Sequence, residues 1–273
     1  MPERFRIALV GAGQMGSALI RGLITARFCE PGQILAADSR KEVLLELASK
    51  LGIQTASSTG AVPDMVSTVV LAVKPQDVPN ALAELSPSMG SRHLLISVAA
   101  GIPLGFLEDR LSAGVRVIRA MPNTPCLLGM GCTAVAPGKL ATPADMATAK
   151  EIFGAVGQTL EVQEKWMDAI TGLSGSGPAY LFLFAQSLVE AGVRQGIPWQ
   201  VARTMVYQTL RGAAEMLLVS GEHPARLIEQ VASPGGTTLA GLAALERGSF
   251  RWLLLQAVEE ATRRGEELSR HLT

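Results

Sequence analysis

The sequence has no long hydrophobic run, few aromatic residues and no excess of charge of either sign. No segment offers roughly 18 uninterrupted apolar residues, so a transmembrane helix is not expected. The apolar run at residues 7–10 stops at a glycine and is too short for the core of a signal peptide. The 24 basic residues are balanced by 24 acidic ones, which excludes the broad positive field that attracts nucleic acid. We expect a cytoplasmic protein that binds neither membranes nor nucleic acid.

Cysteine and histidine are also scarce. Cys29, Cys126 and Cys132 show no paired C-x-x-C spacing, and the three histidines are scattered along the chain. A zinc site requires Cys and His residues that converge in a cluster. The pattern therefore predicts reduced, structural thiols and no metal site.

The first 160 or so residues alternate short apolar runs with amphipathic stretches, a pattern typical of repeated β-α units on a parallel sheet. Aromatic residues make up only 4% of the chain while 48% of it is hydrophobic, so Ala, Leu, Val and Ile supply most of the core. Strands are expected at residues 6–10, 33–37, 68–73, 93–98 and 115–120, with two further short strands at 132–136 and 159–162.

After Glu164 the β-branched runs become rare, and segments with a 3.6-residue period take over. Helices are expected at residues 165–173, 177–195, 198–220, 224–231, 237–247 and 250–271. About 110 residues of helix with so much Ala, Leu and Gly cannot easily bury every apolar face alone. Burial against a second copy is the economical solution, so the sequence predicts a homo-oligomer.

A glycine-rich loop, Gly11-Ala-Gly13-Gln-Met-Gly16, follows the first expected strand and opens a helix. In this context Gly11 permits a tight turn, Gly13 lets the backbone approach a pyrophosphate, and Gly16 allows contact between helix and sheet. The free N–H groups at the start of the helix attract phosphate. The loop predicts a Rossmann-type dinucleotide-binding domain at residues 1–162, followed by an all-helical domain at residues 163–273.

The second strand ends at Asp38-Ser39-Arg40, where this fold meets the adenosine ribose. Asp38 favours the ribose hydroxyls of NAD, whereas Ser39 and Arg40 favour the 2′-phosphate of NADP. Arg40 as a mere solvated residue is the alternative. Lys74, at the end of another strand, is expected to meet the phosphates or ribose unless it is only a surface lysine. The small residues at 97–101 leave room for a nicotinamide.

The segment at residues 233–238, Ser-Pro-Gly-Gly-Thr-Thr, is a flexible turn that runs into a helix. Its N–H groups and hydroxyls suit a small carboxylate, although an ordinary helix cap would look the same. The turn at residues 175–180 has small side chains that would admit either a substrate ring or a partner helix.

A ketone reductase needs a proton donor, and the usual donors are missing here. Lys165 is the last lysine, and neither Tyr180 nor Tyr207 is followed by a lysine four residues later. A protonated imine is itself the electrophile and needs no strong general acid, so orientation and exclusion of water suffice. The absence of a catalytic lysine therefore favours an imine substrate.

Three motifs accompany the segment Ala72-Val-Lys-Pro75. They are Met121-Pro-Asn-Thr-Pro125, Thr171-Gly-Leu-Ser-Gly-Ser-Gly-Pro-Ala-Tyr180 and Ser233-Pro-Gly-Gly-Thr-Thr-Leu-Ala-Gly-Leu242. With them the chain closely resembles pyrroline-5-carboxylate reductases from the glycine loop to the C-terminal helix. The resemblance implies reduction of the cyclic imine 1-pyrroline-5-carboxylate to L-proline, the last step of proline biosynthesis. It also implies an all-α dimerisation domain, a homodimer and further assembly into a decamer, a pentamer of dimers. NADPH (NADP) is the favoured cofactor, with NADH (NAD) as the alternative.

The resemblance and the residue patterns described above together assign site residues. Substrate contacts are expected at Glu164, Ser233, Gly236, Thr237 and Thr238, with Thr238 as the catalytic candidate near the imine nitrogen or carboxylate. Cofactor contacts are expected at Gly11, Gly13, Gln14, Met15, Gly16, Ser39, Arg40, Ala72, Val73, Lys74, Pro75, Val98, Ala100 and Asn123. The chain departs from family patterns at Thr59, where some members have Asn, and at Asp38-Ser39-Arg40, where many have Asn-Arg.

Two other functions remain as alternatives. One is a β-hydroxyacid-type dehydrogenase with the same two-domain plan. The other is a non-catalytic dinucleotide-binding protein, which would bind cofactor without oxidising it in the presence of any imine.

Overall fold

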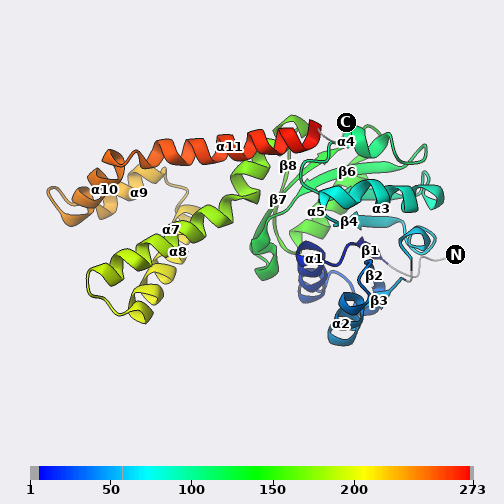
Figure 1. Cartoon of the computed structure of the whole chain (residues 1–273), viewed down its shortest axis with the longest axis horizontal. Helices are drawn as coiled ribbons and strands as arrows, with labels where there is room; N and C mark the ends of the chain where they lie inside the picture. The colour runs from blue at the N-terminus through cyan, green and yellow to red at the C-terminus, as the bar shows by residue number, and fades with distance from the viewer. Residues whose placement is uncertain (1–5, 57, 271–273) are drawn as a thin grey trace. The chain divides into compact units, whose positions relative to one another are not determined.

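A computed structural model describes residues 6–56 and 58–270, and the chain divides into two compact units (Figure 1). The sheet unit comprises Met1–Ser176 and Glu259–Thr273, and the helical unit comprises Gly177–Val258. No helix in the described part of the chain has the length and hydropathy that a membrane span requires.

The sheet unit contains an eight-stranded sheet with the order β3-β2-β1-β4-β5-β6-β7-β8. Its strands are β1 (Ile7–Val10), β2 (Ile34–Ala37), β3 (Gln54–Thr55), β4 (Thr68–Leu71), β5 (Leu94–Ser97), β6 (Arg116–Met121), β7 (Gly131–Pro137) and β8 (Gly157–Glu161). All seven expected strands are confirmed to within two residues at each end. The two-residue strand β3 was not expected, because so short a strand leaves no alternating pattern.

Helices cover both faces of this sheet. They are α1 (Gln14–Thr25), α2 (Lys41–Leu51), α3 (Val78–Leu85), α4 (Leu104–Glu108) and α5 (Pro143–Gly154). In β1, Ile7 and Leu9 face a core shared with α1, α2 and α5. Ala8 and Val10 face the opposite core, shared with α3 and α4. The strand order and two-sided cover are those of a Rossmann-type fold, as expected.

The parallel sheet expected from the β-α alternation is wrong at one place, because β7 runs antiparallel to β6. The connection between them is the short 3₁₀ helix η5 (Thr124–Leu128) rather than a full helical crossover. A parallel pair needs a crossover of a dozen or more residues, whereas an antiparallel pair can be joined by a shorter loop. The strand β8 then pairs parallel to β7, after α5 has provided the crossover.

The continuous helix expected at residues 165–173 is also wrong. The chain there forms a 3₁₀ turn (Glu164–Trp166), helix α6 (Met167–Ile170) and a π-helical turn (Thr171–Gly175). The Asn123 side-chain amide donates to the Ser174 carbonyl at 3.2 Å. A Cβ on Gly175 would lie 2.6 Å from Met121 Cε. These contacts from the end of β6 hold the widened turn, and π turns often mark functional sites.

The helical unit is built from α7 (Gly177–Arg194), α8 (Trp199–Ser220), α9 (Pro224–Val231), α10 (Thr237–Arg247) and the first part of α11 (Phe250–Arg270). These five helices were expected, and their positions are confirmed; the end of the last expected helix, His271, lies outside the described residues. Gly196 and Gly221 end α7 and α8 with φ of +88° and +65°, a conformation that favours glycine.

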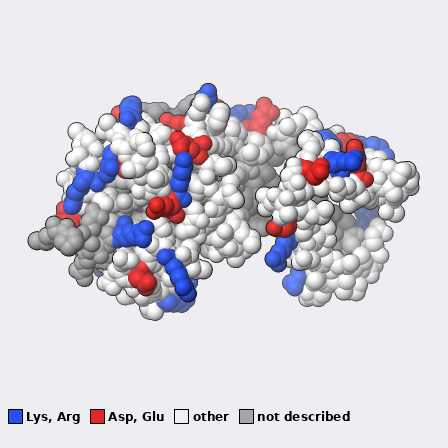
Figure 2. Space-filling model, turned by 180° about the vertical axis from the view of Figure 1, so that it is seen from behind, with Lys and Arg blue, Asp and Glu red and all other residues white. Residues whose placement is uncertain are grey.

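Large apolar side chains remain exposed on the helical unit. Phe182 and Leu181 on α7 are 69% and 61% exposed, and Trp199 and Tyr207 on α8 are also exposed. With neighbours, these four line an apolar hollow of about 740 Å³ between the two helices. On the molecular face drawn in Figure 2, Lys and Arg are interspersed with Asp and Glu, with large uncharged areas between them. An apolar surface of this extent is typical of an interface.

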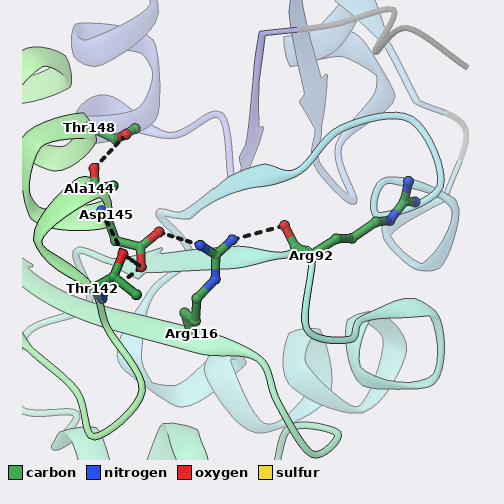
Figure 3. A network of polar contacts seen from close by, with 6 residues as sticks. All are labelled: Arg92, Arg116, Thr142, Ala144, Asp145 and Thr148. Carbon is green, nitrogen blue, oxygen red and sulfur yellow. Dashed lines mark hydrogen bonds and ion pairs between the residues drawn. The ribbon is translucent and has the colours of Figure 1, made fainter.

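Asp145 organises a polar network at the end of the sheet where β6 begins (Figure 3). Its carboxylate accepts from the Thr142 N–H at 2.8 Å, from the Thr142 hydroxyl at 2.6 Å and from Arg116 Nη1 at 2.7 Å. Arg116 also donates to the Arg92 carbonyl at 2.9 Å. The network therefore ties the N-terminus of α5 to the start of β6 and to the turn before β5.

Replacing Asp145 by alanine is expected to lower the free energy of unfolding by about 2–3 kcal/mol, measured by urea denaturation. The change removes the capping box of α5 and leaves the guanidinium of Arg116, which is only 27% exposed, without its carboxylate. Glu161→Ala breaks the exposed pair with Lys150 and is the control, with an expected loss under about 0.5 kcal/mol. Equal losses in the two variants would contradict the prediction.

Candidate functional site

The glycine loop lies between the carboxyl end of β1 and the start of α1, and its three glycines meet different surroundings. Gly11 has a φ of +98°, and a Cβ there would lie 2.6 Å from the backbone of Ala72. A Cβ on Gly16 would collide with the Gly11 carbonyl oxygen. At Gly13, however, the nearest atom to a Cβ is Arg40 Nη2, 3.8 Å away. Gly11 and Gly16 therefore shape the loop, while Gly13 leaves space beside the helix N-terminus for a phosphate.

Asp38 at the end of β2 fastens this loop. Its carboxylate accepts from the Ala12 N–H at 2.7 Å and from the Arg40 N–H at 2.9 Å. It also forms a two-pronged pair with the Arg40 guanidinium, through Nε at 2.9 Å and Nη2 at 3.0 Å. Burial raises the pKa of Asp38, but the hydrogen bonds from Arg40 and Ala12 outweigh burial and leave the pKa below its ordinary value. The carboxylate is thus charged at neutral pH and already occupied.

A hollow of about 590 Å³ opens beside this pair, at the carboxyl ends of β2 and β3. The described residues that line it are Ala37, Asp38, Ser39, Lys41, Leu44, Leu45, Thr55, Ala56, Ser58, Thr59 and Glu84. Its position beyond the second strand is where a Rossmann-type fold meets an adenosine. Ser39 and Thr59, both singled out from the sequence, line the hollow, and Arg40 lies instead beside Gly13.

The other expected cofactor residues gather along the same edge of the sheet. The N-terminal residues of α1, Gln14 and Met15, stand at the carboxyl end of β1. Ala72, Val73, Lys74 and Pro75 follow β4, and Val98 and Ala100 follow β5. Since β1, β4 and β5 are neighbouring parallel strands, their carboxyl ends lie side by side. These residues therefore lie together at the carboxyl edge of the sheet, where open α/β sheets bind their ligands.

Asn123, expected to touch the cofactor, is 9% exposed and engages two backbone segments. Its amide oxygen accepts from the Cys132 N–H at 2.9 Å, and its amide nitrogen donates to the Ser174 carbonyl at 3.2 Å. These bonds connect the loop after β6 with the start of β7 and with the π turn. In this structure Asn123 positions backbone near the sheet edge.

Glu164, expected to touch substrate, is anchored inside the sheet unit. Its Oε1 accepts from the Leu104 N–H at 2.5 Å, at the start of α4, and lies 3.6 Å from Arg119 Nη1. Arg119 is 4% exposed and also donates to Asp168 at 2.8 Å. The carboxylate thus caps α4 and helps to neutralise a buried guanidinium.

The turn at residues 233–238 carries the remaining expected site residues and belongs to the helical unit. Gly235 has a φ of +69°, and the Gly236 N–H donates to the Ser233 carbonyl at 3.0 Å. Gly236 caps α10 without a side-chain hydrogen bond, so the first N–H groups of this helix, from Thr237 onward, have no side-chain acceptor at the cap. The Thr238 hydroxyl donates to the Val231 carbonyl at 3.1 Å. The turn gathers Ser233, Gly236, Thr237 and Thr238 in one anion-favouring position.

Two contributions were missed from the sequence. Asp38 was expected to face a ribose, but its carboxylate holds the Ala12 N–H and Arg40. Lys41 lines the adenosine-side hollow and was overlooked, although its place directly after Arg40 was a usable signal.

Cys29, Cys126 and Cys132 are free thiols, and burial raises the pKa of Cys29 and of Cys126.

Two family models match the chain. Residues 164–268 match the model for pyrroline-5-carboxylate reductase dimerisation. Residues 6–101 match the model for NADP oxidoreductase, coenzyme F420-dependent.

Full-length relatives agree with these matches. The chain is 41% identical to pyrroline-5-carboxylate reductase from Methanosarcina acetivorans, over 98% of this chain and 99% of that one. It is 42% identical to mouse (Mus musculus) pyrroline-5-carboxylate reductase 3, over 99% and 98% of the two chains.

Solved structures give the same answer. The crystal structure of Plasmodium falciparum pyrroline carboxylate reductase with NADP bound has a TM-score of 0.89 and 32% identity, covering 98% of this chain and 99% of that one. The Coxiella burnetii pyrroline-5-carboxylate reductase has a TM-score of 0.91 and 33% identity, covering 97% and 99%. The chain belongs to the pyrroline-5-carboxylate reductase family of NAD(P)H-dependent oxidoreductases.

Proposed function

We propose that this chain reduces 1-pyrroline-5-carboxylate to L-proline, the last step of proline biosynthesis, with hydride from a reduced nicotinamide dinucleotide. The observation that carries the proposal is the turn at residues 233–238, in a chain whose whole length matches the family. Its uncapped N–H groups at the start of α10 suit a small carboxylate. Ser233 and Gly236 shape the turn, and Thr237 supplies a first-turn N–H group.

The dinucleotide is held along the sheet edge. Its pyrophosphate would meet the loop at Gly13 and the first N–H groups of α1, at Gln14 and Met15, with Gly11 and Gly16 keeping the loop in shape. Ala72, Val73 and Pro75, which flank Lys74 after β4, would line the cofactor, and Lys74 itself would meet the phosphates or ribose. Val98 and Ala100, after β5, would leave room for the nicotinamide. When bound, the reduced nicotinamide supplies the hydride, and the protein orients the two reactants and excludes water.

Thr238 is the proposed catalytic residue. A hydroxyl has one proton and two lone pairs, and the Thr238 proton is donated to the Val231 carbonyl. The lone pairs are therefore left to accept from the N–H of a protonated imine. When hydride adds to the imine carbon, the C=N π electrons become the nitrogen lone pair and the product is a neutral amine, so no general acid is required. Within the sheet unit, Glu164 and Asn123 are proposed to hold the backbone at the start of α4 and at the π turn.

We propose NADPH as the preferred cofactor, with NADH as the competing possibility. Ser39 and Lys41 line the adenosine-side hollow and suit a 2′-phosphate. The Plasmodium falciparum relative has NADP bound. The carboxylate of Asp38, which would repel a phosphate, is neutralised by Arg40.

We propose a homodimer formed through the helical region, with further assembly into a decamer, and a cytoplasmic location. The apolar hollow between α7 and α8 lies within the segment that matches the dimerisation model. In functional terms, residues 1–162 form the dinucleotide-binding domain and residues 163–273 the dimerisation and substrate domain. Light scattering of the purified protein distinguishes monomer, dimer and decamer.

The activity is tested by following NADPH and NADH oxidation with the cyclic imine and with a panel of 2-keto acids, and in parallel NADP+ and NAD+ reduction with a panel of 3-hydroxy acids. We expect kcat/KM for the imine to exceed that for every acid by at least about 1,000-fold, because a site built for a charged imine leaves its polar groups unpaired with other substrates. A preference for a 3-hydroxy acid would identify a β-hydroxyacid-type dehydrogenase. Cofactor binding without oxidation of any kind would identify a non-catalytic binding protein.

A further inference from the structure

Two cations stand at the start of α2, next to the adenosine-side hollow, and they have different partners. The guanidinium of Arg40 is paired with Asp38 through two hydrogen bonds of 2.9 and 3.0 Å. The Asp38 side chain is only 7% exposed, whereas the Arg40 side chain is 52% exposed, so solvent reaches the pair from the guanidinium side. The two charges largely cancel, and the pair as a whole offers little attraction to an incoming phosphate.

Lys41 is arranged differently. It lines the hollow together with Ser39, it is exposed, and no ion pair joins it to any residue in the described ranges 6–56 and 58–270. Lys50, on the same helix, has its charge engaged by Glu46 at 2.7 Å. The Lys41 ammonium group is therefore free to pair with an anion in the hollow, and the Ser39 hydroxyl lines the same hollow.

The position of Arg40 supports the same distinction. Its Nη2 is the nearest atom, at 3.8 Å, to the space that a side chain on Gly13 would occupy. Gly13 is where the loop leaves room for the pyrophosphate, a group that NADPH and NADH share. A guanidinium held there by Asp38 meets both cofactors in the same way.

We propose that Lys41, assisted by the Ser39 hydroxyl, binds the 2′-phosphate of NADPH and sets the preference between the two cofactors, whereas Arg40 is held by Asp38 near the pyrophosphate. This assignment rests on the proposed use of a nicotinamide dinucleotide. It differs from the expectation drawn from the sequence, in which Arg40 reads the 2′-phosphate. Arg40 keeps three further N–H donors beyond the two that Asp38 accepts, but its positive charge is already balanced by that carboxylate.

The experiment uses calorimetry with two small probes, adenosine 2′,5′-bisphosphate and adenosine 5′-monophosphate, on the full-length native protein and on Lys41→Ala, Arg40→Ala and Lys50→Ala. Loss of the lysine contact is expected to weaken the bisphosphate about tenfold and to change the monophosphate less than about twofold. Arg40→Ala is expected to weaken both probes alike, and Lys50→Ala neither. Lys41→Arg, which keeps the charge, is expected to restore most of the bisphosphate affinity.

Kinetics with the two dinucleotides completes the test. For Lys41→Ala we expect kcat/KM to fall about tenfold with NADPH and to stay unchanged with NADH. A selective loss in Arg40→Ala, or equal bisphosphate binding by Lys41→Ala and native protein, would overturn the assignment while leaving imine reduction intact. Conversely, a Lys41-dependent bisphosphate affinity in a protein that reduces no imine would refute the proposed function and leave the assignment standing.

Discussion

Replacing Gly13 by valine is expected to lower kcat/KM for NADPH about 100-fold while Tm stays within a few degrees of the native value. The Cβ of the new side chain would enter the space beside Arg40, where its nearest protein atom would be Arg40 Nη2 at 3.8 Å. The fold therefore tolerates it, but a pyrophosphate that must approach the backbone does not. Calorimetric titration with NADPH and thermal unfolding measure the two parts separately.

Gly16→Ala is the matched variant for this prediction. Its added methyl group collides with the Gly11 carbonyl oxygen inside the folded loop, so it should lower Tm even without cofactor. Gly13 and Gly16 thus separate a ligand-binding glycine from a packing glycine within one motif. If Gly13→Val bound NADPH with native affinity, the pyrophosphate would have to lie elsewhere.

Much of the fold follows from local patterns that the sequence displays. In β1, Ile7 and Leu9 face one core and Ala8 and Val10 face the other. Both faces of the strand are buried, and the sequence therefore shows a continuous apolar run, as is typical of strands in a parallel sheet. The limits of α8, α9 and α10 were equally predictable, because Gly221, Pro224 and Gly236 are typical start and stop signals of helices. These features depend on residues close together in the chain.

The features that were missed depend on contacts between distant residues. The short η5 connection sets the direction of β7, and the hydrophobic periodicity of the sequence gives no sign of it. The π turn at Thr171–Gly175 depends on Met121 and Asn123, some fifty residues earlier. The sequence indicates residue types, but it does not indicate which distant backbone group each one meets.

The site was predictable to the same extent. The positions of the glycine loop and the strand ends followed from the motif, and the structure places them at one sheet edge. The partners of Asp38 and Glu164 did not follow, because a carboxylate in a binding motif can equally bind the protein itself. Asp38 accepts from Ala12 and Arg40, and Glu164 accepts from Leu104. A charged residue near a cofactor is therefore assigned more safely after its internal hydrogen bonds are known.

Replacing Thr238 by valine is expected to lower kcat/KM for the imine about 100-fold, with the Kd of NADPH unchanged. Valine keeps the shape of threonine but removes the oxygen whose lone pairs would accept from the protonated imine. Thr238→Ser keeps that oxygen and should recover most of the activity. Thr204→Val in α8 removes a hydroxyl that likewise donates to a backbone carbonyl, at 2.9 Å, and should have little effect.

The pH dependence distinguishes this role from a structural one. A hydrogen bond to the charged form of the imine raises the pKa of the bound imine, so its loss lets the imine deprotonate at lower pH. In Thr238→Val the alkaline limb of the kcat profile should therefore move to lower pH, whereas damage to packing alone would reduce kcat equally at every pH. An unshifted limb would assign the Thr238 hydroxyl to the turn, through its bond to the Val231 carbonyl, and would leave the substrate to the N–H groups of α10.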